Sequence, residues 1–152
     1  MLLLALLMTS CSWGVNLLIA NTTSNDIFVR YTIPSDNENH QFFKAPKTYT
    51  YDASLLKLYK LNENKRPQAI PTEIRMIQET DEIEIRLAPG QVVHIGIYYS
   101  FQQRQEILSR YKLNVVINKE PTITPTIANS QFRHWKNRRT DIWEVGKSID
   151  RK

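Results

Sequence analysis

The sequence predicts an all-β protein, an antiparallel β-sandwich of immunoglobulin-like type with seven to nine short strands. From residue 13 onward apolar and polar side chains alternate with period two, which is the pattern of half-buried strands. Turn-forming clusters recur at intervals of roughly 8 to 15 residues, which is typical of sandwiches. The length of 152 residues, 41% of them hydrophobic, suits one domain with its own core. A small β-barrel is the alternative fold.

Composition excludes several other classes of protein. One cysteine and four glycines are incompatible with a disulfide scaffold or a collagen-like chain. The glycines are not clustered, so a phosphate-binding glycine loop is excluded as well.

The first two strands are predicted on either side of a polar turn at 21–26, which is rich in asparagine, serine and threonine. Pro34 ends the second strand, and 35–39 is a polar loop. The residues expected to face the core are Val15, Leu17, Ile19, Ile27, Val29, Tyr31 and Ile33. Leu18 lies on the opposite face of the first strand from Val15, Leu17 and Ile19.

The next segments are less regular. Residues 47–51 alternate threonine and tyrosine, which favours a strand. Leucines at 55, 58 and 61 recur at helical spacing, yet the same segment also fits a short strand, which we favour because a helix this short is marginal alone. The prolines and charges of 62–71 predict a loop.

The clearest predicted element is a hairpin over 81–101. Isoleucine and leucine alternate inward with glutamate and arginine over 82–87, and 88–91 forms the turn, with Pro89 at the position whose φ proline presets. The return strand is expected to be central and covered on both faces. Residues 100–110 are expected to be a loop or a short helical turn, and strands follow at 113–117 and around 142–145. On the return strand, one face is expected to carry Val93, Ile95, Ile97, Tyr99 and Phe101, and the other Val92, His94, Gly96 and Tyr98.

No catalytic or metal-binding constellation stands out. The three histidines are far apart and lack a second ligand at metal spacing. We expect His40 in a loop, His94 half-buried on a strand and His134 on a basic surface. Glu82 and Glu84 could serve acid and base roles or bind calcium, but a solvated strand face that discourages edge pairing is the better interpretation. We therefore expect no enzyme activity, metal or cofactor.

Positive charge is concentrated at the end of the chain. Residues 131–152 carry seven positive and three negative side chains, so they hold +4 of the net charge of +5. Arginine and lysine mixed with aromatic residues suit an anionic partner, such as lipid headgroups, acidic cell-wall polymers or an acidic protein surface. The alternative is that the tryptophans belong to the core and the charges to a solvated face. The candidate binding residues are Arg133, Trp135, Lys136, Arg138 and Arg139.

An apolar run opens the chain over residues 1–8 and is followed by Thr9, Ser10 and the single cysteine, Cys11. The run is too short to cross a bilayer, which needs about 20 residues, but it fits the apolar region of a secretory signal. Met8-Thr9-Ser10-Cys11 resembles the lipobox of bacterial lipoproteins, and the resemblance covers residues 1–11 only. It implies that 1–10 are removed and that Cys11 becomes the acylated first residue. The alternative is a buried first strand with Cys11 in the core.

These observations predict a signal peptide at 1–10 and one sandwich domain at 11–152, with a basic segment at 131–152. The expected function is that of an envelope lipoprotein, a non-catalytic binding or assembly module. Its expected partners are the membrane, through acylated Cys11, and an envelope protein complex or an anionic cell-wall or lipid surface, with no nucleic acid. In bacterial lipoproteins the residue after the cysteine helps sort the protein between membranes, and Ser12 is not the aspartate associated with inner-membrane retention, so the resemblance implies the outer membrane. The alternative is a ligand carrier or hydrolytic enzyme with a groove around His94, Tyr98 and Tyr99.

Overall fold

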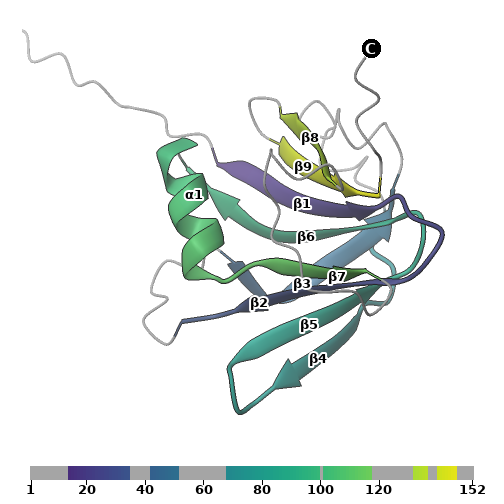
Figure 1. The fold of residues 1–152 in the computed structure, drawn as a ribbon, viewed down its shortest axis with the longest axis horizontal. Helices are drawn as coiled ribbons and strands as arrows, with labels where there is room; N and C mark the ends of the chain where they lie inside the picture. The colour runs from purple at the N-terminus through teal and green to yellow at the C-terminus, as the bar shows by residue number, and fades with distance from the viewer. Residues whose placement is uncertain are drawn as a thin grey trace, which may run out of the picture.

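The computed structural model describes residues 14–34, 42–51, 68–99, 101–117, 132–136 and 140–146. They form two packed β-sheets with one helix at an end (Figure 1). No helix in this described part is long and apolar enough to span a membrane. The elements are β1 (Val15–Asn21), β2 (Ile27–Thr32), β3 (Phe42–Thr50), β4 (Glu73–Ile77), β5 (Glu82–Leu87), β6 (Gln91–Tyr98), α1 (Phe101–Arg110), β7 (Asn114–Ile117), β8 (Phe132–Lys136) and β9 (Thr140–Val145).

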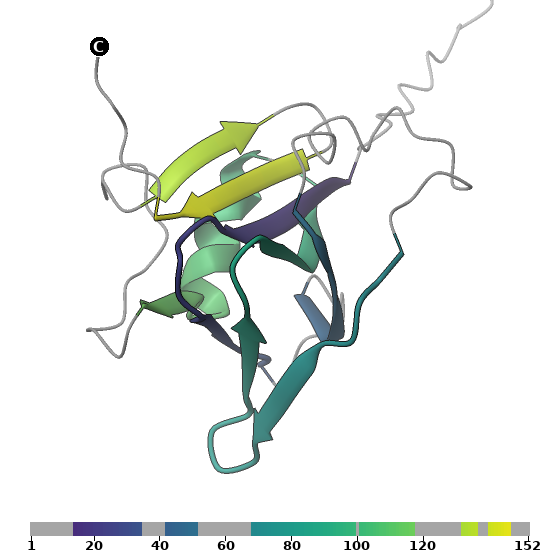
Figure 2. The ribbon, with the colours of Figure 1, turned by 90° about the vertical axis from the view of Figure 1, so that its right-hand side faces the viewer.

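Sheet A has the strand order β3-β6-β1-β9-β8, and sheet B has the order β4-β5-β2-β7. Figure 2 shows the two layers, with β9 beside β1 and β8 beside β9. Both sheets are open, so the predicted β-sandwich is confirmed and the barrel alternative is wrong. One strand pair departs from the antiparallel prediction, because β1 and β9 run parallel. A parallel pair needs a long crossover, and here the first and last described strands meet.

The core between the sheets follows the predicted alternation in β1 and β2. All seven residues expected to face inward, from Val15 to Ile33, belong to one buried cluster. In β1, Leu18 and Ala20 face the other way and join a second cluster with Val92 and Ile142 on the outer face of sheet A. Burial of one leucine-sized side chain contributes about 1.5–3 kcal/mol to the free energy of folding, so the side chains on both faces of sheet A stabilise the fold.

The predicted hairpin over 81–101 is wrong in its pairing, although its turn is correct. Gln91 N–H donates to Ala88 C=O over 3.2 Å, and Gly90 has a φ of 73°, as a type II turn requires. However, β5 pairs with β2 and β4, whereas β6 pairs with β1 and β3. The turn therefore carries the chain from one sheet to the other.

A β-bulge in β6 also changes which residues face the core. Leu17 pairs with Gly96 while Leu18 pairs with His94, so Ile95 is the extra residue. An extra residue reverses the alternation beyond it. Tyr98 is consequently buried in the core, whereas Tyr99 is 51% exposed. The prediction that Ile97 and Tyr99 share a face with Val93 is wrong, and Phe101 begins α1 instead of continuing the strand. The prediction that β6 is a central strand is confirmed.

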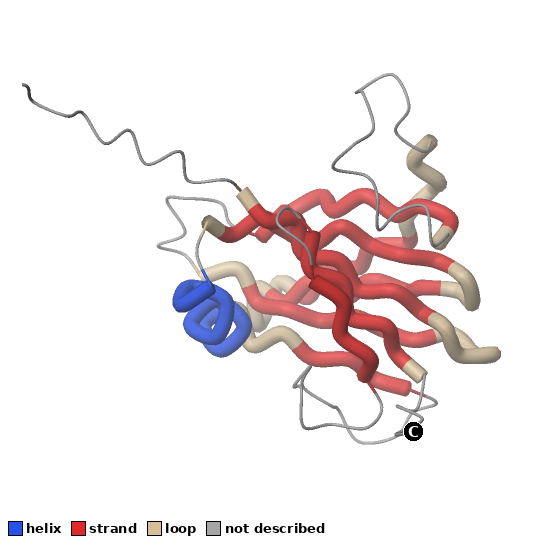
Figure 3. The backbone as a smooth tube through the Cα atoms, turned by 90° about the horizontal axis from the view of Figure 1, so that it is seen from above, coloured by secondary structure: helices blue, strands red, loops and turns tan. Residues whose placement is uncertain are grey.

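Helix α1 closes the end of the sandwich at which β1 begins (Figure 3). Ile107 and Leu108 are buried in the main core, which explains why a glutamine-rich segment forms a helix here. Tyr111, just after α1, stacks on Phe42 with ring centroids 4.2 Å apart. Phe42 in turn meets Tyr31 edge-on at 5.2 Å.

Two strands were not predicted. One is β4, at the edge of sheet B; the other is β8, whose Phe132 is fully buried beside Trp143. Residues 1–13, 35–41, 52–67 and 118–131 lie outside the described part. The predictions for the signal segment, His40 and the leucines of 52–61 therefore remain predictions.

Candidate functional site

The structure describes the candidate binding residues only in part. Cys11, Arg138 and Arg139 lie outside the described residues. Arg133, Trp135 and Lys136 belong to β8, which pairs antiparallel with β9. Part of the basic segment is thus one strand of a sheet rather than a tail.

A polar contact network that the sequence did not predict lies within this region. Asp141 on β9 is fully buried, and its carboxylate accepts a hydrogen bond from the Tyr98 hydroxyl on β6 over 2.6 Å. The other carboxylate oxygen contacts Nε2 of His134 on β8. The three side chains come from three different strands, and we call them the polar clamp: Tyr98, Asp141 and His134.

The face of β9 and the register between β8 and β9 explain why Asp141 and His134 contact one another. Trp143 and Val145 of β9 face the main core, and alternation puts Asp141 on the same face. His134 pairs with Trp143 in the β8–β9 register and stacks on its indole with ring centroids 4.5 Å apart. The prediction that His134 belongs to a basic surface is therefore wrong, since only 18% of its side chain is exposed.

The polar clamp spans the beginning of β1. Tyr98 pairs with Val15 on one side of β1, and Asp141 pairs with Leu17 on the other. The hydrogen bond from Tyr98 to Asp141 therefore crosses over β1 near its first residues. Because a buried carboxylate without partners is costly, both contacts stabilise this arrangement of strands.

The clamp contains a histidine held by an aspartate, which is also how a catalytic base is oriented. Here the third member is Tyr98, whose hydroxyl donates a hydrogen bond to the same aspartate. Buried tyrosine, aspartate and stacked histidine are well suited to joining strands. We therefore interpret the clamp as a structural contact.

His94 and Tyr98 do not share a groove. His94 lies on the outer face of sheet A, edge-on to Phe43 at 4.9 Å, with Nε2 3.1 Å from the Gly96 carbonyl. Tyr98 lies on the core face. The prediction of one groove around both is wrong, because the β-bulge separates them. The prediction that His94 is a half-buried strand residue is confirmed.

Glu82 and Glu84 form ion pairs across sheet B. The Arg30 guanidinium lies 2.5 Å from the Glu84 carboxylate and 3.8 Å from that of Glu82. Their strand, β5, is internal, between β4 and β2. The interpretation that they discourage edge pairing is therefore wrong, and their role is to pair with Arg30. Among the described residues, no group of three histidine, cysteine or acidic side chains could hold a metal ion.

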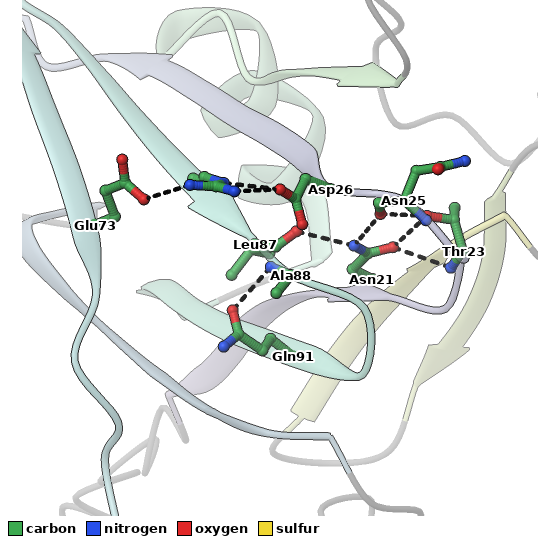
Figure 4. A network of polar contacts seen from close by, with 9 residues as sticks. Asn21, Thr23, Asn25, Asp26, Glu73, Leu87, Ala88 and Gln91 are labelled. Atoms are coloured by element: carbon green, nitrogen blue, oxygen red, sulfur yellow. Dashed lines mark hydrogen bonds and ion pairs between the residues drawn. The ribbon is translucent and has the colours of Figure 1, made fainter.

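The opposite end of the sandwich is held by a network around Asn21, shown in Figure 4. Its buried amide donates to the carbonyls of Asn25 and Leu87 over 2.8 and 2.9 Å, and its oxygen accepts from Thr23. Beside it, Arg86 bridges Asp26 at 2.6 Å and Glu73 at 3.1 Å. Hydrogen bonds to Asp26 and Glu73 raise the pKa of Arg86. This network joins the turn after β1 to the turn after β5.

Comparison with known proteins adds no assignment. No protein-family model, curated protein or solved structure matches the chain significantly.

Proposed function

We propose that the protein is a membrane-anchored envelope lipoprotein whose sandwich acts as a non-catalytic binding or assembly module. Cys11 would be the acylated first residue of the mature chain, and the outer membrane would be its location. The observation that carries the proposal is the small separation between the lipobox-like sequence and the folded body. Only three residues separate Cys11 from Val15, the first residue of β1.

A separation this small restricts where the body can be. An extended chain covers at most about 3.3–3.6 Å per residue, so the beginning of β1 would lie within about 15 Å of the acylated cysteine. Stable anchoring takes more than one acyl chain, and lipoprotein acylation supplies two or three. The end of the sandwich where β1 begins would then face the membrane surface.

The polar clamp supports this orientation because it stabilises the end of the sandwich through which the domain would be anchored. An anchored domain is held through its first strand, and the clamp joins the strands on both sides of that strand at this end. The contacts of two internal carboxylates also support a non-catalytic role, since Asp141 and Glu84 are both engaged by protein partners.

The basic residues belong to the same end by sequence. β8 ends at Lys136 and β9 begins at Thr140, which pairs with Asn16 near the beginning of β1. Asn137, Arg138 and Arg139 connect these two strands. Anionic headgroups attract basic side chains near the surface by about 1 kcal/mol each, so this connection would add to the anchor.

Metabolic labelling with radioactive palmitate tests the anchor. The full chain is compared with Cys11→Ala and with a matched control, Met8→Leu, which keeps an aliphatic residue before the cysteine. We expect label on the parent chain and on Met8→Leu and its loss in Cys11→Ala. Absence of label from all three would contradict the proposal, as would label that survives in Cys11→Ala.

Sedimentation with phosphatidylglycerol vesicles tests the basic residues in a Cys11→Ala background. Arg138→Glu combined with Arg139→Glu should weaken binding several-fold at low salt. The control makes the same charge change at two exposed lysines of β3, Lys44→Glu with Lys47→Glu, and should bind more tightly than the first variant. Equal binding by both variants would refute a specific role for Arg138 and Arg139.

A further inference from the structure

The strand β4 is the outermost strand of sheet B in the described part of the chain (Figure 1). Its five residues pair with β5 in an uninterrupted register. One of the two edge strands of sheet A differs, because β3 contains Pro46, two exposed lysines and a register shift between Phe42 and Lys47. Proline, lysine and bulges are among the means of preventing edge-to-edge pairing, together with other charged side chains and short strands. β4 contains no proline, lysine or bulge, and its two charged residues, Glu73 and Arg75, have opposite signs.

The backbone groups at the outer edge of β4 can be assigned from the register. Ile33, just after β2, donates its N–H to the Asp81 carbonyl over 3.2 Å, on the side of β5. Backbone direction alternates along a strand and from strand to strand. Following the β2–β5 and β5–β4 registers, the N–H and C=O groups of Arg75 point toward β5. Those of Ile74 and Met76 therefore point outward, away from the sheet.

The same two residues have exposed apolar side chains. Ile74 is 37% exposed and Met76 is 56% exposed. They pair with Ile85 and Ile83, which are buried in the main core, so all four lie on the core face of sheet B. Ile74 and Met76 are thus core-face residues that the protein's own sheet A does not cover.

The charges of β4 are self-complementary. If two β4 strands pair antiparallel about a two-fold axis through Ile74, each Ile74 opposes its copy and each Glu73 opposes an Arg75. The next opposed pair is Met76 with Thr72. Arg75 is exposed and forms no ion pair with the described residues, and Glu73 is exposed beside Arg86. Opposite charges directly across an antiparallel pair stabilise it, and like charges destabilise it.

We propose that β4 is a self-association edge, at which a second copy of the chain pairs antiparallel in this register and joins two copies of sheet B into one continuous sheet. A two-fold contact of this kind is closed, because the same strand serves on both copies. A five-residue edge buries little area, so the dimer is reversible and concentration-dependent. This association is independent of the proposed acylation of Cys11.

Disulfide trapping tests both the edge and the register. Ile74→Cys is introduced into the full chain carrying Cys11→Ser, purified in detergent and oxidised by air with copper phenanthroline. Opposed residues of a hydrogen-bonded pair have Cα atoms about 5.5 Å apart, within the range of a disulfide. Two copies of Met76→Cys would be about 13 Å apart, too far to bridge. Val116→Cys, on the other edge strand β7, is the second control.

The proposal requires a covalent dimer from Ile74→Cys at several-fold higher yield than from Met76→Cys or Val116→Cys. Equal yields from all three would overturn it, because they would indicate random collision. A Met76→Cys yield above that of Ile74→Cys would overturn the register. Because these positions are exposed or half-exposed, circular dichroism should show an unchanged fold for each variant.

Sedimentation velocity of the full chain without an introduced cysteine gives an independent measurement. Arg75→Glu turns both attractive pairs into repulsive ones and should raise the dimer dissociation constant about tenfold or more. Adding Glu73→Arg restores opposite charges across the axis and should recover dimerisation, although it removes the pair with Arg86. A protein that sediments as a monomer at all concentrations would overturn the proposal. A strand of another protein found paired with β4 in place of a second copy would overturn it as well.

Discussion

The outer faces of the two sheets carry different kinds of side chain. On sheet A, Leu18, Ala20, Val92 and Ile142 form a second buried apolar cluster behind the strands. On sheet B, the outer face carries ion pairs of Arg30 with Glu84 and of Arg86 with Asp26. Sheet A is therefore stabilised from both sides and sheet B mainly from one. The difference teaches that the sheet containing the first and last described strands buries apolar side chains on both of its faces.

The difference also separates the two proposals in space. The proposed membrane-facing end belongs to sheet A, where the polar clamp crosses β1. The proposed self-association edge belongs to sheet B, at β4. One sheet would hold the anchor while the other contacts a second copy.

Removing the buried carboxylate of the clamp should have the largest effect. Asp141→Ala leaves the Tyr98 hydroxyl and His134 without their shared acceptor, and we expect a loss of about 3–5 kcal/mol in the free energy of unfolding. Urea denaturation measures it. The control, Tyr98→Phe, removes one hydrogen bond and should cost about 1–2 kcal/mol. Equal and small losses would mean that the clamp does not hold sheet A together.

The outer faces can be compared directly by truncation. Leu18→Ala on sheet A removes a side chain that is 2% exposed and should cost about 2–4 kcal/mol. Phe28→Ala on sheet B removes a larger side chain that is only partly buried, and we expect about 1 kcal/mol because part of its surface already meets water. A greater loss from Phe28→Ala would contradict the contrast between the sheets.

A tyrosine that connects the sheets should make stability fall at alkaline pH. The Tyr31 hydroxyl, on β2, donates to the Phe43 carbonyl, on β3, over 2.6 Å. Burial raises its pKa above the ordinary value of 10.0. The unfolded chain therefore loses this proton first, so the contribution of Tyr31 is intact below pH 10 and is lost as the pH rises toward the folded pKa.

The slope is at most about 1.4 kcal/mol per pH unit for one group. The stability advantage of the parent chain over Tyr31→Phe should therefore shrink between pH 10 and 11, measured by urea denaturation at each pH. A constant difference between the two proteins across this interval would show that Tyr31 titrates normally.

The ion pairs on sheet B should have the smallest effect. Arg30→Ala breaks contacts with Glu84 and Glu82, and because the arginine side chain is 35% exposed we expect only about 0.5–1 kcal/mol. Thermal unfolding at low and high salt should show that the loss decreases at 1 M salt, where the screening length is about 3 Å. A loss that persists at high salt would indicate that packing of the arginine stem matters more than charge.

Local sequence patterns predicted β2 and β5 of sheet B better than β6 of sheet A. In β2 and β5 the alternation of apolar and charged residues matches the burial of each position, because one face meets the core and the other meets water. In β6 both faces are apolar, so the sequence contains no sign of the bulge at Ile95 that reverses Tyr98 and Tyr99. The turn at Pro89 and Gly90 was predicted correctly, yet no local pattern shows which sheet receives each flanking strand.

The candidate site also contains residues that the sequence could identify and contacts that it could not. Sequence alone identified the lipobox-like residues before Cys11 and the concentration of positive charge in the last 22 residues, because both are local properties. The polar clamp required three strands far apart in the chain to meet, with β1 between them. A hairpin prediction over 132–145 from its alternating residues would have brought His134 near Asp141, but not Tyr98.

The sequence by itself determined that this protein is all-β, where its first turn lies and which residues of β1 and β2 face the main core, since side-chain alternation and turn chemistry act over a few residues. Only the tertiary structure decided that β1 and β9 pair in parallel and that β5 and β6 belong to different sheets. It also decided that Asp141 is buried with Tyr98 and His134. The physical reason is that strand pairing joins backbone groups that every residue has, so partners are chosen by the packing of the whole core.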